Sequence, residues 1–246
     1  MSPKRRLRVG GYDIDVRLSQ AQPGGRTLIM VHGIGASGAY FMPFAEVSAG
    51  EYDVHVIDLP GYGVTPKPML PLDLEQLAEA VAAYIRSLRV GKVTIVGHSM
   101  GCQIAAHVAV RHPALCRSLI LLGPTVNRGH RSRRMQGVKL LMDTFKEPAA
   151  ANALLFRSYL QMGMRRYLRT ARFMVEDKVE ETLSKTAVPV LIIRGERDPI
   201  VPRAWVEHLS RQTPHVTVHE IAHAAHVVQF TKPEELLTVC RPFLDA

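Results

Sequence analysis

The sequence has little cysteine and few aromatic residues. It contains three cysteines in 246 residues, Cys102, Cys116 and Cys240, and such an odd, sparse set provides no disulfide framework and favours a reducing compartment. Phe, Trp and Tyr make up 6% of the chain, yet hydrophobic residues as a whole make up 47%. A chain of this length and apolar content can bury a sizeable core without disulfides or metals, which excludes intrinsic disorder.

Long hydrophobic runs are also absent. No stretch approaches the roughly 18 uninterrupted apolar residues of a membrane-spanning helix. The first residues, MSPKRRLRVGGYDIDV, are basic but lack the apolar run of a signal peptide. We therefore expect a cytoplasmic protein without a transmembrane segment.

Positive charge is unevenly distributed. The net charge is +9, and residues 126–186 hold 13 Lys and Arg against 6 Asp and Glu. Such a segment could hold an anionic group of a substrate, attract anionic lipid at a membrane surface, or form a solvated helix face. No nucleic-acid-binding module accompanies the charge, so we expect no nucleic acid partner. Eight arginines of residues 126–186 form two clusters: Arg128, Arg131, Arg133 and Arg134, then Arg165, Arg166, Arg169 and Arg172.

Short apolar runs alternate with helical stretches along most of the chain. Buried strands separated by helices are typical of a mainly parallel sheet. Residues 6–18 alternate as a hairpin of edge strands around Gly10-Gly11. The apolar runs that predict the sheet are 27–31, 54–57, 93–96, 119–122, 190–193 and 216–218.

Helix signals fill the spaces between these runs. Asp73 is expected to cap a helix that continues to Leu88, a second helix runs over 99–111, and Pro202 opens a third. The segment Thr231-Lys-Pro-Glu234 predicts a capping box for the last helix. Residues 125–186 lack strand signals and predict a helical insertion over the strand ends, where open α/β sheets bind ligands.

One motif predicts nucleophilic chemistry. Gly97-His98-Ser99-Met100-Gly101 follows an apolar strand and opens a helix, which is the context that a G-x-S-x-G nucleophile elbow requires. The two glycines remove side chains from a tight turn, and the helix N-terminus favours developing negative charge.

Over nearly its whole length the chain resembles the α/β-hydrolase-fold superfamily, in its serine-nucleophile, esterase- and lipase-like branch with a helical cap. The segments that carry the resemblance are VHGIGASG (31–38), VIDLPGYGVTPKP (56–68), IVGHSMG (95–101), RGERDPIVP (194–202) and HAAHVVQFTKP (223–233). It implies a mostly parallel central sheet flanked by helices. The implied domains are a hydrolase core over 1–124 and 187–246 and a helical cap or lid over 125–186.

The resemblance implies a catalytic triad in the order Ser, Asp, His. The positions are Ser99 as nucleophile, Asp198 after its strand as the acid, and His226 as the base. Asp58 competes as the acid but is expected to shape its own loop. His223 competes as the base, yet only His226 has the family's spacing of seven to the proline that opens the last helix. Activity should fall at low pH as the base gains a proton.

Two backbone N–H groups would form the oxyanion hole. We expect them from Met100 and, by resemblance, from Ile34, with Gly35 as the second choice. His32 is expected to brace its loop. Further candidates for substrate binding in the cap and pocket are Gly33, His98, Met135, Phe145, Tyr159 and Arg166.

The predicted enzyme cleaves a carboxylic ester, thioester or lactone through an acyl-enzyme on Ser99. Its substrate is a small molecule with an apolar acyl group that could also carry an anionic group. Two alternatives stay open: a carbon–carbon bond hydrolase of a meta-cleavage-type diketo acid, and a hydrolase-fold ligand receptor with little turnover. No cofactor is expected, and the histidines at 219, 223 and 226 lack the further ligand that a metal site needs. The oligomeric state is left open.

Overall fold

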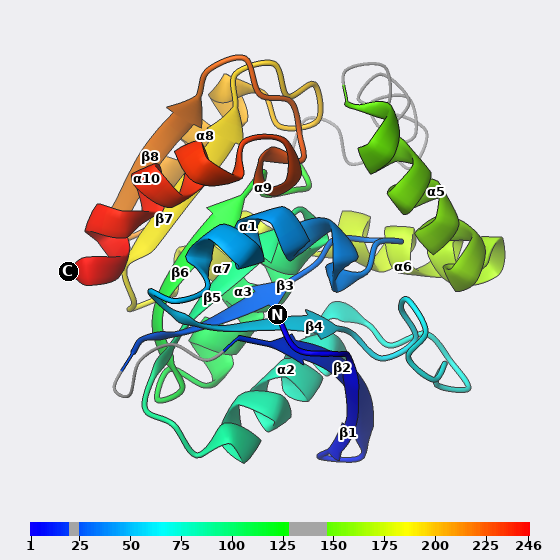
Figure 1. Ribbon diagram of the computed structural model, residues 1–246. Coiled ribbons are helices and arrows are strands. Elements are labelled where there is room, and N and C mark those ends of the chain that lie inside the picture. Colours follow the sequence, from blue (N-terminus) through cyan, green and yellow to red (C-terminus); the bar gives the residue numbers. More distant parts are fainter. Residues whose placement is uncertain (20–24, 128–146) are drawn as a thin grey trace.

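The computed structural model in Figure 1 describes residues 1–19, 25–127 and 147–246. Within these ranges the chain forms an eight-stranded sheet in the order β1-β2-β4-β3-β5-β6-β7-β8. The strands are β1 (Arg5–Val9), β2 (Tyr12–Leu18), β3 (Thr27–Val31), β4 (Asp53–Asp58), β5 (Val93–His98), β6 (Cys116–Leu122), β7 (Val190–Gly195) and β8 (Val216–Ile221). Every predicted strand is therefore present.

Most of the sheet is parallel. The β1–β2 hairpin turns at Gly10-Gly11, and β2 pairs antiparallel with β4. All other neighbours, from β4 through β8, run parallel. The carboxyl ends of β3, β5, β6 and β7 therefore meet along one edge, so residues that follow these strands are brought together.

Helices cover both faces of the sheet (Figure 1). One face carries α2 (Leu74–Leu88), α3 (Met100–Arg111), α7 (Val179–Leu183) and α8 (Arg203–Gln212), and the other carries α1 (Met42–Ser48), α9 (Val228–Thr231) and α10 (Pro233–Asp245). The β3 strand shows why two layers are needed. Its five residues are all buried, with Ile29 and Val31 packed in one core and Leu28 and Met30 in the other, because successive side chains leave opposite faces of a strand.

The predicted helix starts had different outcomes. The Asp73 carboxylate accepts the Gln76 backbone N–H at 2.8 Å, and the Gln76 side chain accepts the Asp73 N–H, so the cap of α2 is confirmed. The predicted capping box at Thr231 is wrong. Thr231 ends α9, and its hydroxyl donates to the Val227 carbonyl at 3.2 Å, so it is already inside a helical turn when α10 begins at Pro233.

Three helices lie between β6 and β7 in the part of this segment that the structure describes. They are α5 (Ala149–Met162), α6 (Met164–Glu176) and α7, and no strand occurs in the described residues 123–127 and 147–189. In Figure 1, α5 and α6 stand beside the end of the sheet where the parallel strands stop. The division of the chain into a core and a cap stays a prediction. None of the described helices has the length and apolar character needed to cross a membrane.

Candidate active site

Ser99 occupies the turn between β5 and α3. Its backbone has a φ of 55°, a left-handed conformation that a residue with a side chain rarely adopts. Close backbone contacts leave no room for a side chain at the two flanking glycines. A Cβ on Gly97 would lie 2.4 Å from the Gly101 carbonyl oxygen, and a Cβ on Gly101 would lie 2.1 Å from the Val31 carbonyl oxygen. The helix can therefore begin directly against β3 only with glycine at both positions.

His226 and Asp198 form a buried pair. The imidazole Nδ1 lies 2.7 Å from the Asp198 Oδ2, while Oδ1 accepts the backbone N–H groups of Ile200 at 2.7 Å and Val201 at 3.0 Å. Because a carboxylate only accepts hydrogen bonds, Nδ1 is the donor. In the neutral ring this leaves Nε2 as the basic nitrogen.

The competing candidates have other contacts. Asp58 accepts the Gly38 N–H at 2.6 Å and pairs with Lys4, so it braces its loop. His223 is exposed and lies beside Glu196 and Arg197.

His32 is buried between two backbone groups and braces its loop, as expected. Its Nδ1 lies 2.9 Å from the Gly33 carbonyl oxygen, and its Nε2 accepts the Leu59 N–H at 3.1 Å. Burial lowers the pKa of His32. In the described part of the chain, no three His, Cys, Asp or Glu side chains are placed to share one metal ion.

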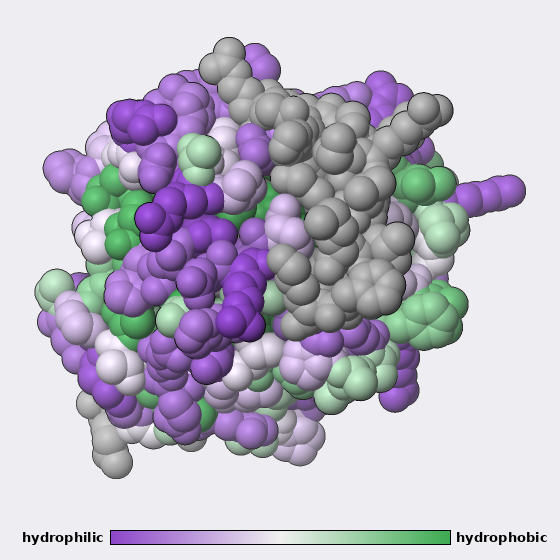
Figure 2. All heavy atoms as spheres, turned by 90° about the horizontal axis from the view of Figure 1, so that it is seen from above, coloured by the Kyte–Doolittle hydropathy of each residue, from purple (hydrophilic) through white to green (hydrophobic). Residues whose placement is uncertain are grey.

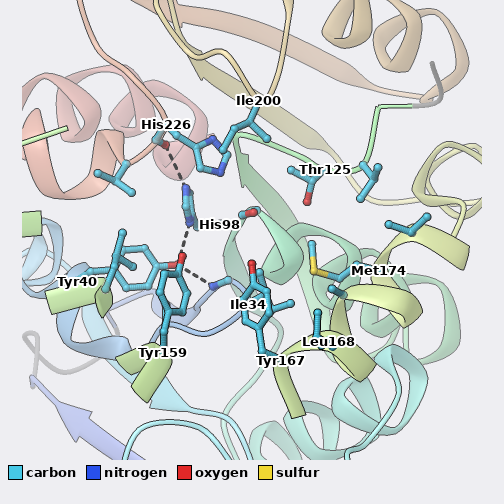
Figure 3. A pocket seen from close by; sticks show the side chains of 18 residues that line it. Ile34, Tyr40, His98, Thr125, Tyr159, Tyr167, Leu168, Met174, Ile200 and His226 are labelled. Atoms are coloured by element: carbon cyan, nitrogen blue, oxygen red, sulfur yellow. Dashed lines mark hydrogen bonds between the residues drawn. The ribbon is translucent and has the colours of Figure 1, made fainter. Parts of the chain in front are cut away.

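A cavity of about 210 Å³ opens at the strand ends (Figure 3). Ser99 and His226 both line it, together with Gly33, Ile34 and His98 from the sheet side. The opposite wall comes from α5 and α6 and is mainly apolar. Its residues are Leu155, Tyr159, Tyr167, Leu168, Ala171, Met174 and Val175.

His98 joins His226 to the loop after β3. Its Nε2 lies 3.1 Å from the His226 carbonyl oxygen and its Nδ1 lies 2.8 Å from the Tyr40 hydroxyl, which accepts the Gly33 N–H at 2.7 Å (Figure 3). A carbonyl only accepts, so Nε2–H donates and Nδ1 accepts from Tyr40. Burial lowers the pKa of His98 well below its usual value, which keeps this neutral arrangement.

Glu147 is a site residue that the sequence did not point to. Its carboxylate accepts the Val227 N–H at 2.8 Å and therefore holds the chain directly after His226. Burial raises the pKa of Glu147. Eighty residues separate these partners, and Glu147 belongs to none of the segments that carry the family resemblance, so only the folded chain reveals the contact.

The remaining predicted residues differ in how they relate to the cavity. Met100 is buried as the first residue of α3, directly after Ser99. Tyr159 packs on Gly35, where a Cβ would lie 2.1 Å from its ring. Arg166 does not line the cavity, because its guanidinium turns away and donates to the Pro68 carbonyl at 2.6 Å. Met135 and Phe145, with the first arginine cluster, lie outside the described residues.

The Tyr40 hydroxyl can be tested by removal. Tyr40→Phe leaves the buried Gly33 N–H and His98 Nδ1 without their partner, so we expect the free energy of unfolding to fall by about 1–3 kcal/mol. Urea denaturation measures the change. Tyr12→Phe in the edge hairpin is the control, and equal effects of the two substitutions would contradict the role assigned to Tyr40.

The chain resembles known proteins in both sequence and fold. A family model described as "Alpha/beta hydrolase family" matches residues 28–239. The chain is 27% identical to the pimeloyl-[acyl-carrier protein] methyl ester esterase of Chromobacterium violaceum, with 90% of this chain and 95% of that protein covered. It is 26% identical to the 2-(acetamidomethylene)succinate hydrolase of Mesorhizobium japonicum, with 98% and 95% covered.

Solved structures give the same result. The crystal structure of a membrane phospholipase A superposes with a TM-score of 0.83 and 25% sequence identity, covering 99% of this chain and 86% of that one. The family model spans Ser99, Asp198 and His226, and the relatives align along almost the entire chain. This chain therefore belongs to the alpha/beta hydrolase family and is a hydrolase.

Proposed function

We propose that Ser99, His226 and Asp198 are a catalytic triad, and that the enzyme cleaves carboxylic esters through an acyl-enzyme on Ser99. The observation that carries the proposal is the shared cavity. Ser99 and His226 line it together, while Asp198 holds the His226 Nδ1 at 2.7 Å. A serine hydroxyl is a weak nucleophile, and a base oriented by a carboxylate activates it.

In the proposed reaction the Ser99 oxygen attacks the ester carbonyl and His226 Nε2 takes its proton. Collapse of the tetrahedral intermediate expels the alcohol, which receives that proton from His226. Water, deprotonated by the same nitrogen, then attacks the acyl-enzyme, and collapse of the second tetrahedral intermediate releases the acid and returns the proton from His226 to the Ser99 oxygen. The Asp198 carboxylate stabilises the imidazolium that forms at each attack.

The oxyanion needs two N–H donors near Ser99. A Cβ on Gly33 would lie 3.1 Å from the Ser99 Cβ, so the loop after β3 adjoins the nucleophile. The Gly33 N–H is already bound to Tyr40. This favours Ile34 as the donor from the loop, and Met100 supplies the second donor from the start of α3.

The cavity favours an uncharged acyl group. Residues 149–176, which we assign to a cap, present apolar and tyrosine side chains to it, and no Lys or Arg lines it among the residues that the structure describes. A diketo acid or a dicarboxylate would need a cation to offset the desolvation of its charge. An ester with an apolar acyl group fits this lining better than the substrate of a carbon–carbon hydrolase, and thioesters and lactones share the same chemistry.

The triad is tested with p-nitrophenyl esters. We expect Ser99→Ala to remove turnover, and Asp198→Asn to lower kcat by about 10⁴-fold because the amide favours the wrong imidazole tautomer, as in the well-studied serine protease. Release of p-nitrophenol measures both rates, and circular dichroism checks folding. An Asp58→Asn variant that loses as much activity as Asp198→Asn would contradict the assignment of the acid.

Acyl-group preference tests the apolar lining. We expect p-nitrophenyl hexanoate to have a kcat/KM at least 100-fold above that of the same ester with a carboxylate at the end of its chain, because burial of an unpaired charge costs several kcal/mol. Paired assays at one pH measure the ratio. A preference for the carboxylate ester would move the assignment towards acidic substrates.

A further inference from the structure

The outer faces of α5 and α6 carry exposed apolar side chains. The exposed fractions are 63% for Phe156, 68% for Leu160, 71% for Met164 and 48% for Leu168. These four residues, called the α5–α6 patch, lie on the two helices that meet at the right of Figure 1, and Figure 2 shows hydrophobic residues at that edge of the molecule. Clustered exposed apolar residues on a monomer mark an interaction surface.

Arginines surround the α5–α6 patch. Arg157 is exposed on α5, and Arg165 and Arg169 are exposed on α6. Helix α5 contains no acidic residue, and α6 contains only Glu176, which pairs with Arg172 at 2.6 Å at the far end of the helix. The surface is therefore apolar at its centre and positively charged around it.

A second apolar segment adjoins this surface. Met69 and Leu70 are exposed on the loop before α2, Met69 to 97%. Arg166 of α6 donates to the Pro68 carbonyl at 2.6 Å, so the loop is held against the helix that carries the patch. In Figure 1 this loop projects on the same side as α5 and α6.

The patch also reaches the cavity. Leu168 is half exposed and at the same time lines the cavity that contains Ser99. Leu155 and Tyr159 line the cavity from the inner side of α5, while Phe156 and Leu160 face outward. An apolar molecule located at the outer surface would thus lie next to the site.

We propose that the α5–α6 patch, with Met69 and Leu70, docks on the surface of an anionic phospholipid bilayer. Its apolar side chains would enter the boundary between headgroups and acyl chains, and the arginines would face lipid phosphates, to which guanidinium groups bind well. Charge complementarity points to an anionic lipid as the partner, because the surface is cationic and neither helix carries an acidic side chain without a basic partner. This proposal rests on the proposed function in one respect, because an ester substrate would then enter the cavity from the bilayer.

Vesicle flotation tests the surface without catalysis. The full chain with Ser99→Ala is mixed with vesicles of phosphatidylcholine, with or without phosphatidylglycerol. We expect binding to the anionic vesicles that weakens as salt is raised. The partition coefficient on anionic vesicles should fall at least fivefold for each arginine in the Arg165→Glu/Arg169→Glu variant. It should fall on both kinds of vesicle in the Phe156→Ser/Leu160→Ser variant.

Matched variants control for charge and hydrophobicity. Arg5→Glu/Arg8→Glu changes the net charge equally on the edge strand β1, and Val90→Ser/Val218→Ser removes two exposed valines elsewhere. Both should bind as the parent does. Equal losses in patch and control variants would overturn the proposal, and so would absence of binding to anionic vesicles. The protein could instead form a dimer that does not bind vesicles and that dissociates in the Phe156→Ser/Leu160→Ser variant. That result would also overturn the proposal, because the patch would then be a subunit contact.

The two proposals can fail separately. Turnover of soluble p-nitrophenyl esters without vesicle binding would remove the docking surface and leave the esterase assignment intact. Vesicle binding without ester turnover would support the surface and remove the assignment.

Discussion

The conformation of Ser99 is the constraint on which the site depends. A φ of 55° at a residue with a side chain costs of order 1–3 kcal/mol and persists only when its surroundings impose it. Those surroundings are a buried central strand on one side and a helix on the other, in contact through Gly97 and Gly101. The stability of the core therefore holds the proposed nucleophile in place.

Close packing against glycine also positions His226, which lines the cavity together with Ser99. A Cβ on Gly195, at the end of β7, would lie 2.1 Å from the Ala225 carbonyl oxygen, and one on Gly123, after β6, would lie 2.9 Å from the His226 Cε1. Glycine at both strand ends gives the His226 loop room to pack against the sheet. Glu147 and His98 then hold that loop through the Val227 N–H and the His226 carbonyl, so His226 is fixed from several directions.

Local signals in the sequence were sufficient for the sheet and the elbow, because each depends on a short run of residues, such as a buried apolar strand or a glycine-flanked serine, whose structure is decided by its neighbours in the chain. The pairing of Asp198 with His226 spans 28 residues and was implied by the resemblance to the family. The contacts of Tyr40 with His98 and of Glu147 with Val227 span 58 and 80 residues, and nothing local marks them. Arg166 is the opposite case. Its place in an arginine cluster suggested a substrate contact, but its guanidinium donates to the Pro68 carbonyl instead.

Covalent labelling of the nucleophile tests the central claim most directly. The protein would be treated with a fluorophosphonate, which phosphonylates an activated serine, and the modified peptide identified by mass spectrometry, with His226→Ala treated in parallel. The account predicts one phosphonyl group per chain, on Ser99, and loss of labelling in His226→Ala. Labelling of another serine, or labelling of Ser99 that does not depend on His226, would contradict it.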